Sequence, residues 1–196
     1  MRLLSLLVAL GALVALAVVV ARAQRVEART GSVTLVGDSL NVGLEPYLPS
    51  ELEGWQIRNV NLVGRQTDAG IAELERIGSG LSRVVVVSLG TNDPQSDADG
   101  FRRDVDRALR IAGRDRCVVW STIWRDGSNE AFNDVLRQAA RRYPNLKVED
   151  WASLVDASPH LLAPDRVHGS PAGYRRRAED VADLARRCLP APVPER

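Results

Sequence analysis

Ser39 and His168 are the side chains whose types and spacing most directly suggest covalent chemistry. Ser39 follows Gly37 and Asp38 at the end of an apolar run, and His168 stands three residues after Asp165. A serine hydroxyl attacks a carbonyl when a base takes its proton, and that base needs a carboxylate to hold its tautomer. Ser39 is therefore a candidate nucleophile and His168 its candidate base. The ordinary alternatives are that Ser39 caps a helix and that His168 is a surface histidine.

Two further residues could stabilise the negative charge that develops during such an attack. Asn92 lies in the segment Gly90-Thr91-Asn92 and could direct its side-chain NH₂ group into the same cleft. Gly64 could offer a main-chain N–H group. Both residue types are also common in plain turns, so these two positions keep a structural alternative. His160, the other histidine, has no acidic residue beside it.

These residues must be positioned by short apolar runs that alternate with amphipathic stretches. Helical spacing of apolar residues marks four stretches, and the last of them begins at Ser170-Pro171, a cap followed by proline. A short helix is expected from Leu40 to about Tyr47. Strands are expected at residues 33–36, 56–60, 84–87, 117–120 and 146–148. Alternation of buried strands and helices predicts an α/β fold with a parallel sheet of about five strands, in which functional residues lie at the carboxyl ends of the strands.

Composition excludes several other functions. The formal net charge is +1, because 26 Lys and Arg are nearly matched by 25 Asp and Glu, which argues against a nucleic-acid partner bound through a basic face. Two cysteines and two histidines are too few for a zinc site of the usual spacing, so no metal is expected. The sequence also lacks a Gly-x-Ser-x-Gly elbow, a dinucleotide fingerprint and a phosphate loop.

The N-terminal segment is the most apolar part of the chain. Residues 3–21 carry no charge, which approaches the length that a helix needs to cross a bilayer. We expect residues 1–23 to be a membrane anchor or a cleaved signal peptide rather than a buried helix. Residues 24–31 then form a linker, residues 32–189 the functional domain, and residues 190–196 a proline-rich tail.

Four sequence blocks resemble, in order, those of the SGNH (GDSL-type) hydrolases: Gly37-Asp38-Ser39-Leu40, Gly64, Gly90-Thr91-Asn92 and Asp165-Arg166-Val167-His168. The resemblance covers nearly the whole chain after the apolar segment. It implies a flavodoxin-like three-layer α/β/α sandwich. It also implies Ser39 as nucleophile, His168 as general base, Asp165 as its orienting acid, and an oxyanion hole made by Ser39 N–H, Gly64 N–H and Asn92. No metal or organic cofactor is implied.

A closer likeness concerns the segments Val63-Gly64-Arg65-Gln66 and Glu149-Asp150-Trp151. Both resemble the extracytoplasmic SGNH domains of bacterial membrane-bound O-acyltransferases that act on cell-wall sugars. This chain differs in having one candidate span, and in having Gly169-Ser170-Pro171 in place of the more usual Leu-Thr-Pro. We therefore expect an extracytoplasmic serine esterase, anchored to the bacterial cell membrane or secreted, that removes short acyl groups such as O-acetyl from a cell-envelope carbohydrate. An O-acetyltransferase and a catalytically silent glycan-binding module are the alternatives.

Two expectations concern the surroundings of the site. Cys117 opens a strand and Cys188 closes the last helix, so both could lie at the amino edge of the sheet and form a disulfide, the alternative being two buried thiols. The loops look short and no apolar lid follows the anchor, which favours short esters over long-chain esters. Four charged residues in or near strand-end loops could contact a sugar or simply form a solvated rim: Arg65, Asp93, Arg125 and Asp126.

Overall fold

The computed structural model describes residues 31–189. The expected anchor at residues 1–23, almost all of the linker and the proline-rich tail lie outside the described residues. Within residues 31–189, no helix has both the length and the apolar character needed to cross a membrane.

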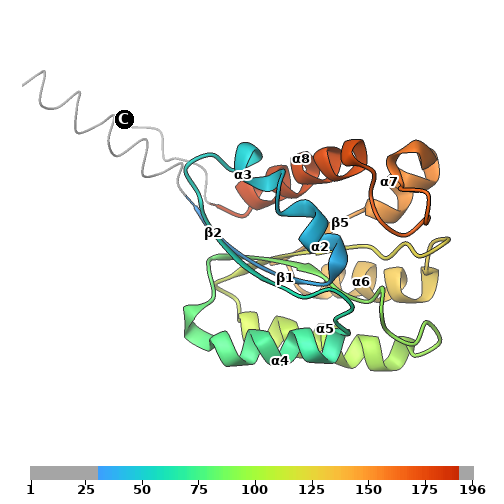
Figure 1. The fold of residues 1–196 in the computed structure, drawn as a ribbon. Coiled ribbons are helices and arrows are strands. Elements are labelled where there is room, and N and C mark those ends of the chain that lie inside the picture. The colour runs from blue at the N-terminus through green and yellow to red at the C-terminus, as the bar shows by residue number, and fades with distance from the viewer. Residues whose placement is uncertain (1–30, 190–196) are drawn as a thin grey trace, which may run out of the picture.

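A five-stranded parallel sheet forms the centre of the molecule, with strand order β2-β1-β3-β4-β5 (Figure 1). The central strand β3 is buried along its whole length, which its run of β-branched residues favours, whereas the edge strand β2 is largely exposed. The strands are β1 (Ser32–Gly37), β2 (Gln56–Asn61), β3 (Val84–Ser88), β4 (Cys117–Ser121) and β5 (Leu146–Glu149). The predicted α/β fold with a parallel sheet of about five strands is confirmed.

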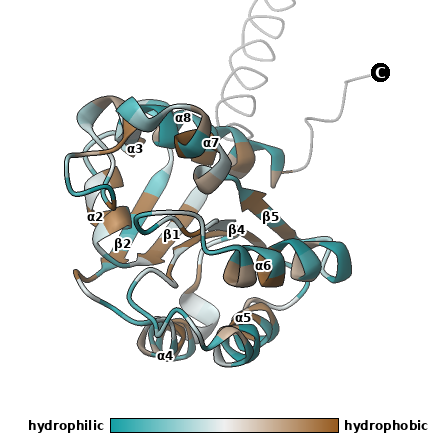
Figure 2. Cartoon of the chain, turned by 90° about the vertical axis from the view of Figure 1, so that its right-hand side faces the viewer, coloured by the Kyte–Doolittle hydropathy of each residue, from teal (hydrophilic) through white to brown (hydrophobic). Residues whose placement is uncertain are grey.

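Helices cover both faces of this sheet, which makes three layers (Figure 1). Alternate residues of a strand point to opposite faces, so Val85 and Val87 pack against one helical layer while Val84 and Val86 pack against the other. The first layer contains α4 (Thr67–Ile77), α5 (Ala98–Ala112) and α6 (Glu130–Arg142), and the second contains α2 (Ser39–Leu44), α3 (Leu48–Glu51), α7 (Trp151–Ala157) and α8 (Pro171–Arg187). Two 3₁₀ turns, η1 (Gly78–Gly80) and η2 (Pro159–Leu161), complete the described elements. Figure 2 shows hydrophobic residues on the strands at the centre and hydrophilic residues along the outer sides of the helices.

The helix starts show how local sequence sets the element boundaries. The predicted start of α8 is confirmed, since the Ser170 hydroxyl accepts a hydrogen bond from Gly173 N–H and Pro171 takes the first helical position. The helix after β1 is shorter than predicted and ends at Leu44. The seven-residue helix α7 was not predicted, because so short a segment has almost no periodicity to recognise.

The amino edge of the sheet carries a disulfide between Cys117 and Cys188, whose Cα atoms lie 5.7 Å apart. Cys117 is the first residue of β4, and Cys188 caps the end of α8. The bond ties the last helix to the sheet at the end opposite the strand-end loops that carry Ser39 and Asn92.

Candidate active site

Ser39 is the first residue of α2, and one residue, Asp38, separates it from the carboxyl end of β1. The N-cap of this helix is Asp38, whose Oδ1 accepts a hydrogen bond from Leu40 N–H at 2.9 Å. The alternative that Ser39 caps the helix is therefore wrong. Since Asp38 does the capping, the Ser39 hydroxyl is free to interact with a residue from another part of the chain.

That residue is His168, which lies in the loop before α8. Its Nε2 atom is 2.8 Å from Ser39 Oγ, and its Nδ1 atom is 2.7 Å from Asp165 Oδ2. An ionised carboxylate only accepts hydrogen bonds, so Nδ1 carries the proton and Nε2 is left to accept the Ser39 hydroxyl proton. The arrangement can activate a serine hydroxyl by general base catalysis.

The Asp165 carboxylate is held in its charged form by its own loop. Its Oδ1 atom accepts the main-chain N–H groups of His168 and Val167, each at 3.0 Å. These two N–H groups and the His168 ring lower the pKa of Asp165 to about 2. The carboxylate therefore stays ionised at any pH at which His168 could act as a base.

The three expected oxyanion donors come from three strand ends. The described hydrogen bonds leave the N–H groups of Ser39 and Gly64 unpaired. Gly64 has a φ of +75°, which a residue with a side chain rarely adopts. The Asn92 NH₂ group donates to Asp38 Oδ2 at 3.0 Å and to the main-chain oxygen of Arg65 at 3.2 Å. Asn92 is thus bonded to the chain neighbours of both Ser39 and Gly64, which places the three donors in one region.

The role of Asp38 is not evident from the sequence. Its side chain is fully buried, and this burial raises its pKa from 3.8 to about 6, against the opposing effects of Leu40 N–H and the charge of Arg177. Both of its partners, Leu40 N–H and the Asn92 amide, are donors. Because a carboxylate only accepts, Asp38 fixes which end of the Asn92 amide faces it.

A second feature missed from the sequence is a buried ion pair beneath the site. Arg177 of α8 and Glu149 of β5 are both almost inaccessible to solvent, with Nε and Oε2 3.2 Å apart. The Arg177 Nη2 group also donates to Ser88 Oγ at 3.0 Å and Ser121 Oγ at 2.7 Å, at the ends of β3 and β4. Removal of one partner of such a pair would leave an uncompensated buried charge. The ion pair therefore joins α8 rigidly to three strand ends. Glu149 was noted only as part of a resembling segment, and nothing in the local sequence indicates its pairing with Arg177.

The four charged residues considered as sugar contacts or as a solvated rim all have partners within the chain. Arg65 is only 8% exposed and donates to main-chain carbonyl groups at the ends of β1 and β2, so it is not a surface ligand. Asp93 accepts the first N–H group of α4 at 2.8 Å. Arg125 and Asp126 are exposed but contact neighbouring loops.

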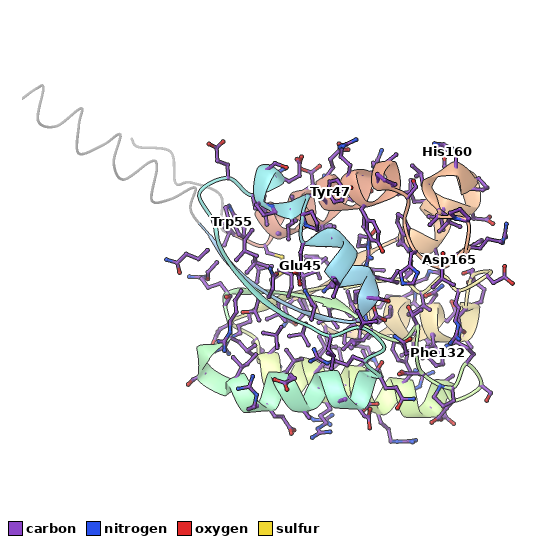
Figure 3. The ribbon with its side chains drawn as sticks, viewed as in Figure 1. Glu45, Tyr47, Trp55, Phe132, His160 and Asp165 are labelled. Atoms are coloured by element: carbon purple, nitrogen blue, oxygen red, sulfur yellow. A yellow bond between two sulfur atoms is a disulfide. The ribbon has the colours of Figure 1, made fainter. Side chains whose placement is uncertain are left out.

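His160 lies apart from these residues. It belongs to η2, its side chain is exposed, and its main-chain oxygen accepts the hydroxyl of Ser170 at 3.3 Å. Figure 3 labels His160 and Asp165 on separate parts of the same end of the molecule.

No protein-family model and no curated protein sequence matches this chain. Solved structures do match it. The C-terminal catalytic domain of peptidoglycan O-acetyltransferase A from Streptococcus pneumoniae, solved with a methylsulfonyl adduct, is 21% identical, with a TM-score of 0.63 over 82% of this chain and 92% of that one. A lipase/acylhydrolase from Enterococcus faecalis is 19% identical, with a TM-score of 0.70 over 82% and 97%. A member of the lipolytic G-D-S-L family from Veillonella parvula is 20% identical, with a TM-score of 0.68 over 78% and 97%. The expected resemblance to SGNH hydrolases is thereby confirmed for the fold.

Proposed function

We propose that this protein is an SGNH-type serine esterase with Ser39 as nucleophile, His168 as general base and Asp165 as its orienting acid. The observation that carries the proposal is the continuous hydrogen-bonded chain from Asp165 through His168 to Ser39. It joins residues 129 positions apart in the sequence at the carboxyl edge of the sheet. A catalytically silent binding module has no need of this alignment.

The reaction follows from this geometry. Ser39 Oγ attacks the ester carbonyl while His168 Nε2 takes the hydroxyl proton, and Asp165 stabilises the imidazolium that forms. Ser39 N–H and Gly64 N–H stabilise the oxyanion, and the Asn92 amide joins them when the N–H group that now donates to the main-chain oxygen of Arg65 turns to the oxyanion. His168 then gives its proton to the departing alcohol, which leaves an acyl group on Ser39. A water molecule, deprotonated by His168, releases the acid and restores the serine.

We infer that the substrate carries a short acyl group, such as O-acetyl, on a cell-envelope carbohydrate. The site is open, since the side chains of His168 and Asp165 are 38% and 52% exposed. The loop before Gly64 presents Leu62 and Val63 with 58% and 68% of their surface exposed, which offers a small apolar contact. An open site accommodates a bulky sugar, whereas a long acyl chain gains affinity only where its methylene groups are buried.

The proposed location is extracytoplasmic, with the chain anchored to the membrane or secreted. Two features support it: the uncharged segment at residues 3–21 and the disulfide between Cys117 and Cys188. Disulfides persist in oxidising compartments and are rare where thiols are kept reduced.

A peptidoglycan O-acetyltransferase is the second candidate function. One observation favours it, namely that a catalytic domain with that activity in its name shares this fold. In such an enzyme a sugar hydroxyl would take the place of water in the second half of the reaction. The open site leaves room for either acceptor.

A head-to-head assay separates these functions. The protein and its Ser39→Ala variant are incubated with an aryl acetate in the presence and absence of a glycan acceptor, and released acetate and acetylated glycan are both measured. The esterase proposal expects acetate release that depends on Ser39 and is not diverted by the acceptor. Predominant acetyl transfer would support the second candidate, and no Ser39-dependent turnover with either acceptor would contradict both.

A further inference from the structure

The loop between β4 and α6 contributes none of the residues to which the proposed reaction assigns a role, yet it contacts two loops that do. In Figure 1 this loop lies between the loop that carries Asp165 and His168 and the loop that carries Asn92. Three consecutive residues, Trp124, Arg125 and Asp126, make the contacts and together form a brace between the two loops.

The first set of contacts ends on one main-chain atom, the carbonyl oxygen of Arg166. Trp124 Nε1 donates to this oxygen at 3.1 Å, and the main-chain N–H of Asp126 donates to it at 3.2 Å. In return, the Arg166 Nε atom donates to Asp126 Oδ1 at 2.8 Å. Arg166 follows Asp165 directly and precedes His168 by two residues, so these hydrogen bonds hold the short segment that joins the two.

Both ends of this contact have an unusual backbone. Asp126 and Arg166 have φ values of +54° and +59°, and they are the two non-glycine residues with positive φ within residues 31–189. Residues in this region of backbone space are strained and persist where surrounding contacts impose the conformation. The hydrogen bonds to Arg166 are contacts of that kind.

The second contact reaches the other side of the site. Arg125 Nη1 donates to the main-chain oxygen of Thr91 at 2.9 Å. Thr91 is buried and directly precedes Asn92, the proposed oxyanion donor. One arginine therefore connects the brace to the loop that positions the Asn92 amide.

The brace is itself fixed to the core. Trp124 is 6% exposed and packs in an apolar cluster with Val155 of α7. The preceding residue, Ile123, exchanges two hydrogen bonds with the fully buried side chain of Asn133 on α6, at 2.7 and 3.0 Å. A loop anchored in this way can hold its neighbours in place.

We propose that Trp124, Arg125 and Asp126 are positioning residues that set His168 against Ser39 and the Asn92 amide against the oxyanion. The proposal rests on the proposed function, because it assigns the brace a role in that reaction. A misplacement of about 1 Å can cost about 10²-fold in rate, so loss of one brace contact should slow turnover without changing substrate binding.

The test of the first contact is Trp124→Phe, which removes the indole N–H and keeps an aromatic ring. Val155→Ala is the matched control, because it removes packing from the same cluster and no hydrogen bond to Arg166. We expect Trp124→Phe to lower kcat for an aryl acetate about 10-fold with KM unchanged, and Val155→Ala to leave kcat nearly unchanged. If Trp124→Phe and Val155→Ala lose thermal stability equally and also lose kcat equally, the hydrogen bond to Arg166 has no role of its own, and the proposal is overturned.

The test of the second contact is a double-mutant cycle. Arg125→Ala should lower kcat about 5-fold in the wild-type chain and have no further effect in an Asn92→Ala background, because Arg125 acts through Asn92. The exposed Arg107→Ala on α5 serves as the control. An Arg125→Ala effect that persists in full without the Asn92 amide would overturn this half of the proposal.

Proton NMR gives a readout that does not depend on catalysis. The His168 Nδ1 proton, shared with Asp165, should give a resonance far downfield that shifts or broadens in Trp124→Phe and is retained in Val155→Ala. If the wild-type protein shows this resonance but no Ser39-dependent turnover, the proposed function is wrong. The role of the brace is then still tested by comparing the resonance in Trp124→Phe with that in Val155→Ala. An unchanged resonance in Trp124→Phe would contradict the brace whatever the activity.

Discussion

Replacement of Asp38 by asparagine should separate the activity of this protein from its stability. The variant keeps a good N-cap for α2, because asparagine caps helices as well as aspartate does. It places an NH₂ group where Asp38 Oδ2 now accepts from Asn92, so two donors face each other and the Asn92 amide turns or moves. Loss of one oxyanion donor costs about 10²-fold in kcat, and we expect a decrease of that size.

The same change should remove a pH-dependent loss of folding stability that the wild-type protein has at neutral pH. The pKa of Asp38 is raised from 3.8 to about 6 by burial, so the folded protein binds this proton more tightly than the unfolded chain does. The stability of the wild-type protein therefore carries a penalty that is absent below pH 3.8 and complete above pH 6. At its full size this loss of unfolding free energy is about 3 kcal/mol. Asparagine does not ionise, so the Asp38→Asn variant does not have this loss.

Two measurements test this reasoning. Steady-state kinetics with an aryl acetate give kcat and KM, and urea unfolding between pH 4 and pH 8 gives the free energy of unfolding. The difference in unfolding free energy should grow in favour of Asp38→Asn by up to about 3 kcal/mol as the pH rises. Asp97→Asn, the same substitution at the exposed N-cap of α5, should leave kcat unchanged. A fully active Asp38→Asn enzyme would refute the role of Asp38 in orienting Asn92. A difference in unfolding free energy between the variant and the wild type that does not change with pH would refute the raised pKa of buried Asp38.

Further predictions concern the base, the disulfide and the acyl group. His168→Ala should lower kcat about 10³-fold or more with the fold retained, and the assignment is wrong if His160→Ala is the damaging change instead. Asp165→Asn should cost a comparable factor because it allows the wrong His168 tautomer, and an unchanged pH–rate profile would contradict this. Replacing Cys117 and Cys188 by serine opens a loop with a separation of 71 residues and should cost roughly 4 kcal/mol of unfolding free energy, measured by urea unfolding. On aryl esters from acetyl to palmitoyl, kcat/KM should be highest for the short chains, and a steady rise with chain length would point to a lipase.

The parts of the fold that could be predicted are those with strong local signals. The valine run of β3 and the Ser170-Pro171 start of α8 each determine their element within a few residues, and both are where they were expected. Helix α7 escaped detection because seven residues contain too few turns to show a period. The start of α2 depends on which of two adjacent capping residues, Asp38 or Ser39, bonds to Leu40 N–H, and local sequence does not distinguish them.

In the site, too, some residues could be predicted from local sequence and others could not. Ser39 and Asn92 were proposed from their places at strand ends, because a parallel sheet gathers such residues at one edge, and His168 was proposed from its spacing after Asp165. The roles of Asp38 and Arg177 arise only from contacts made across the fold. Asp38 meets Asn92 across 54 residues, and Arg177 meets Leu40 across 137. Contacts of that range leave no periodicity or spacing in a single sequence.

Covalent trapping with a fluorophosphonate tests the central claim most directly. The probe reacts with a serine oxygen that a neighbouring base has activated, and intact-mass measurement followed by peptide mapping locates the adduct. We expect one adduct per chain, on Ser39, absent from Ser39→Ala and formed far more slowly in His168→Ala. A folded protein that forms no adduct, or an adduct that persists in Ser39→Ala, would contradict the assignment of Ser39 as an activated nucleophile.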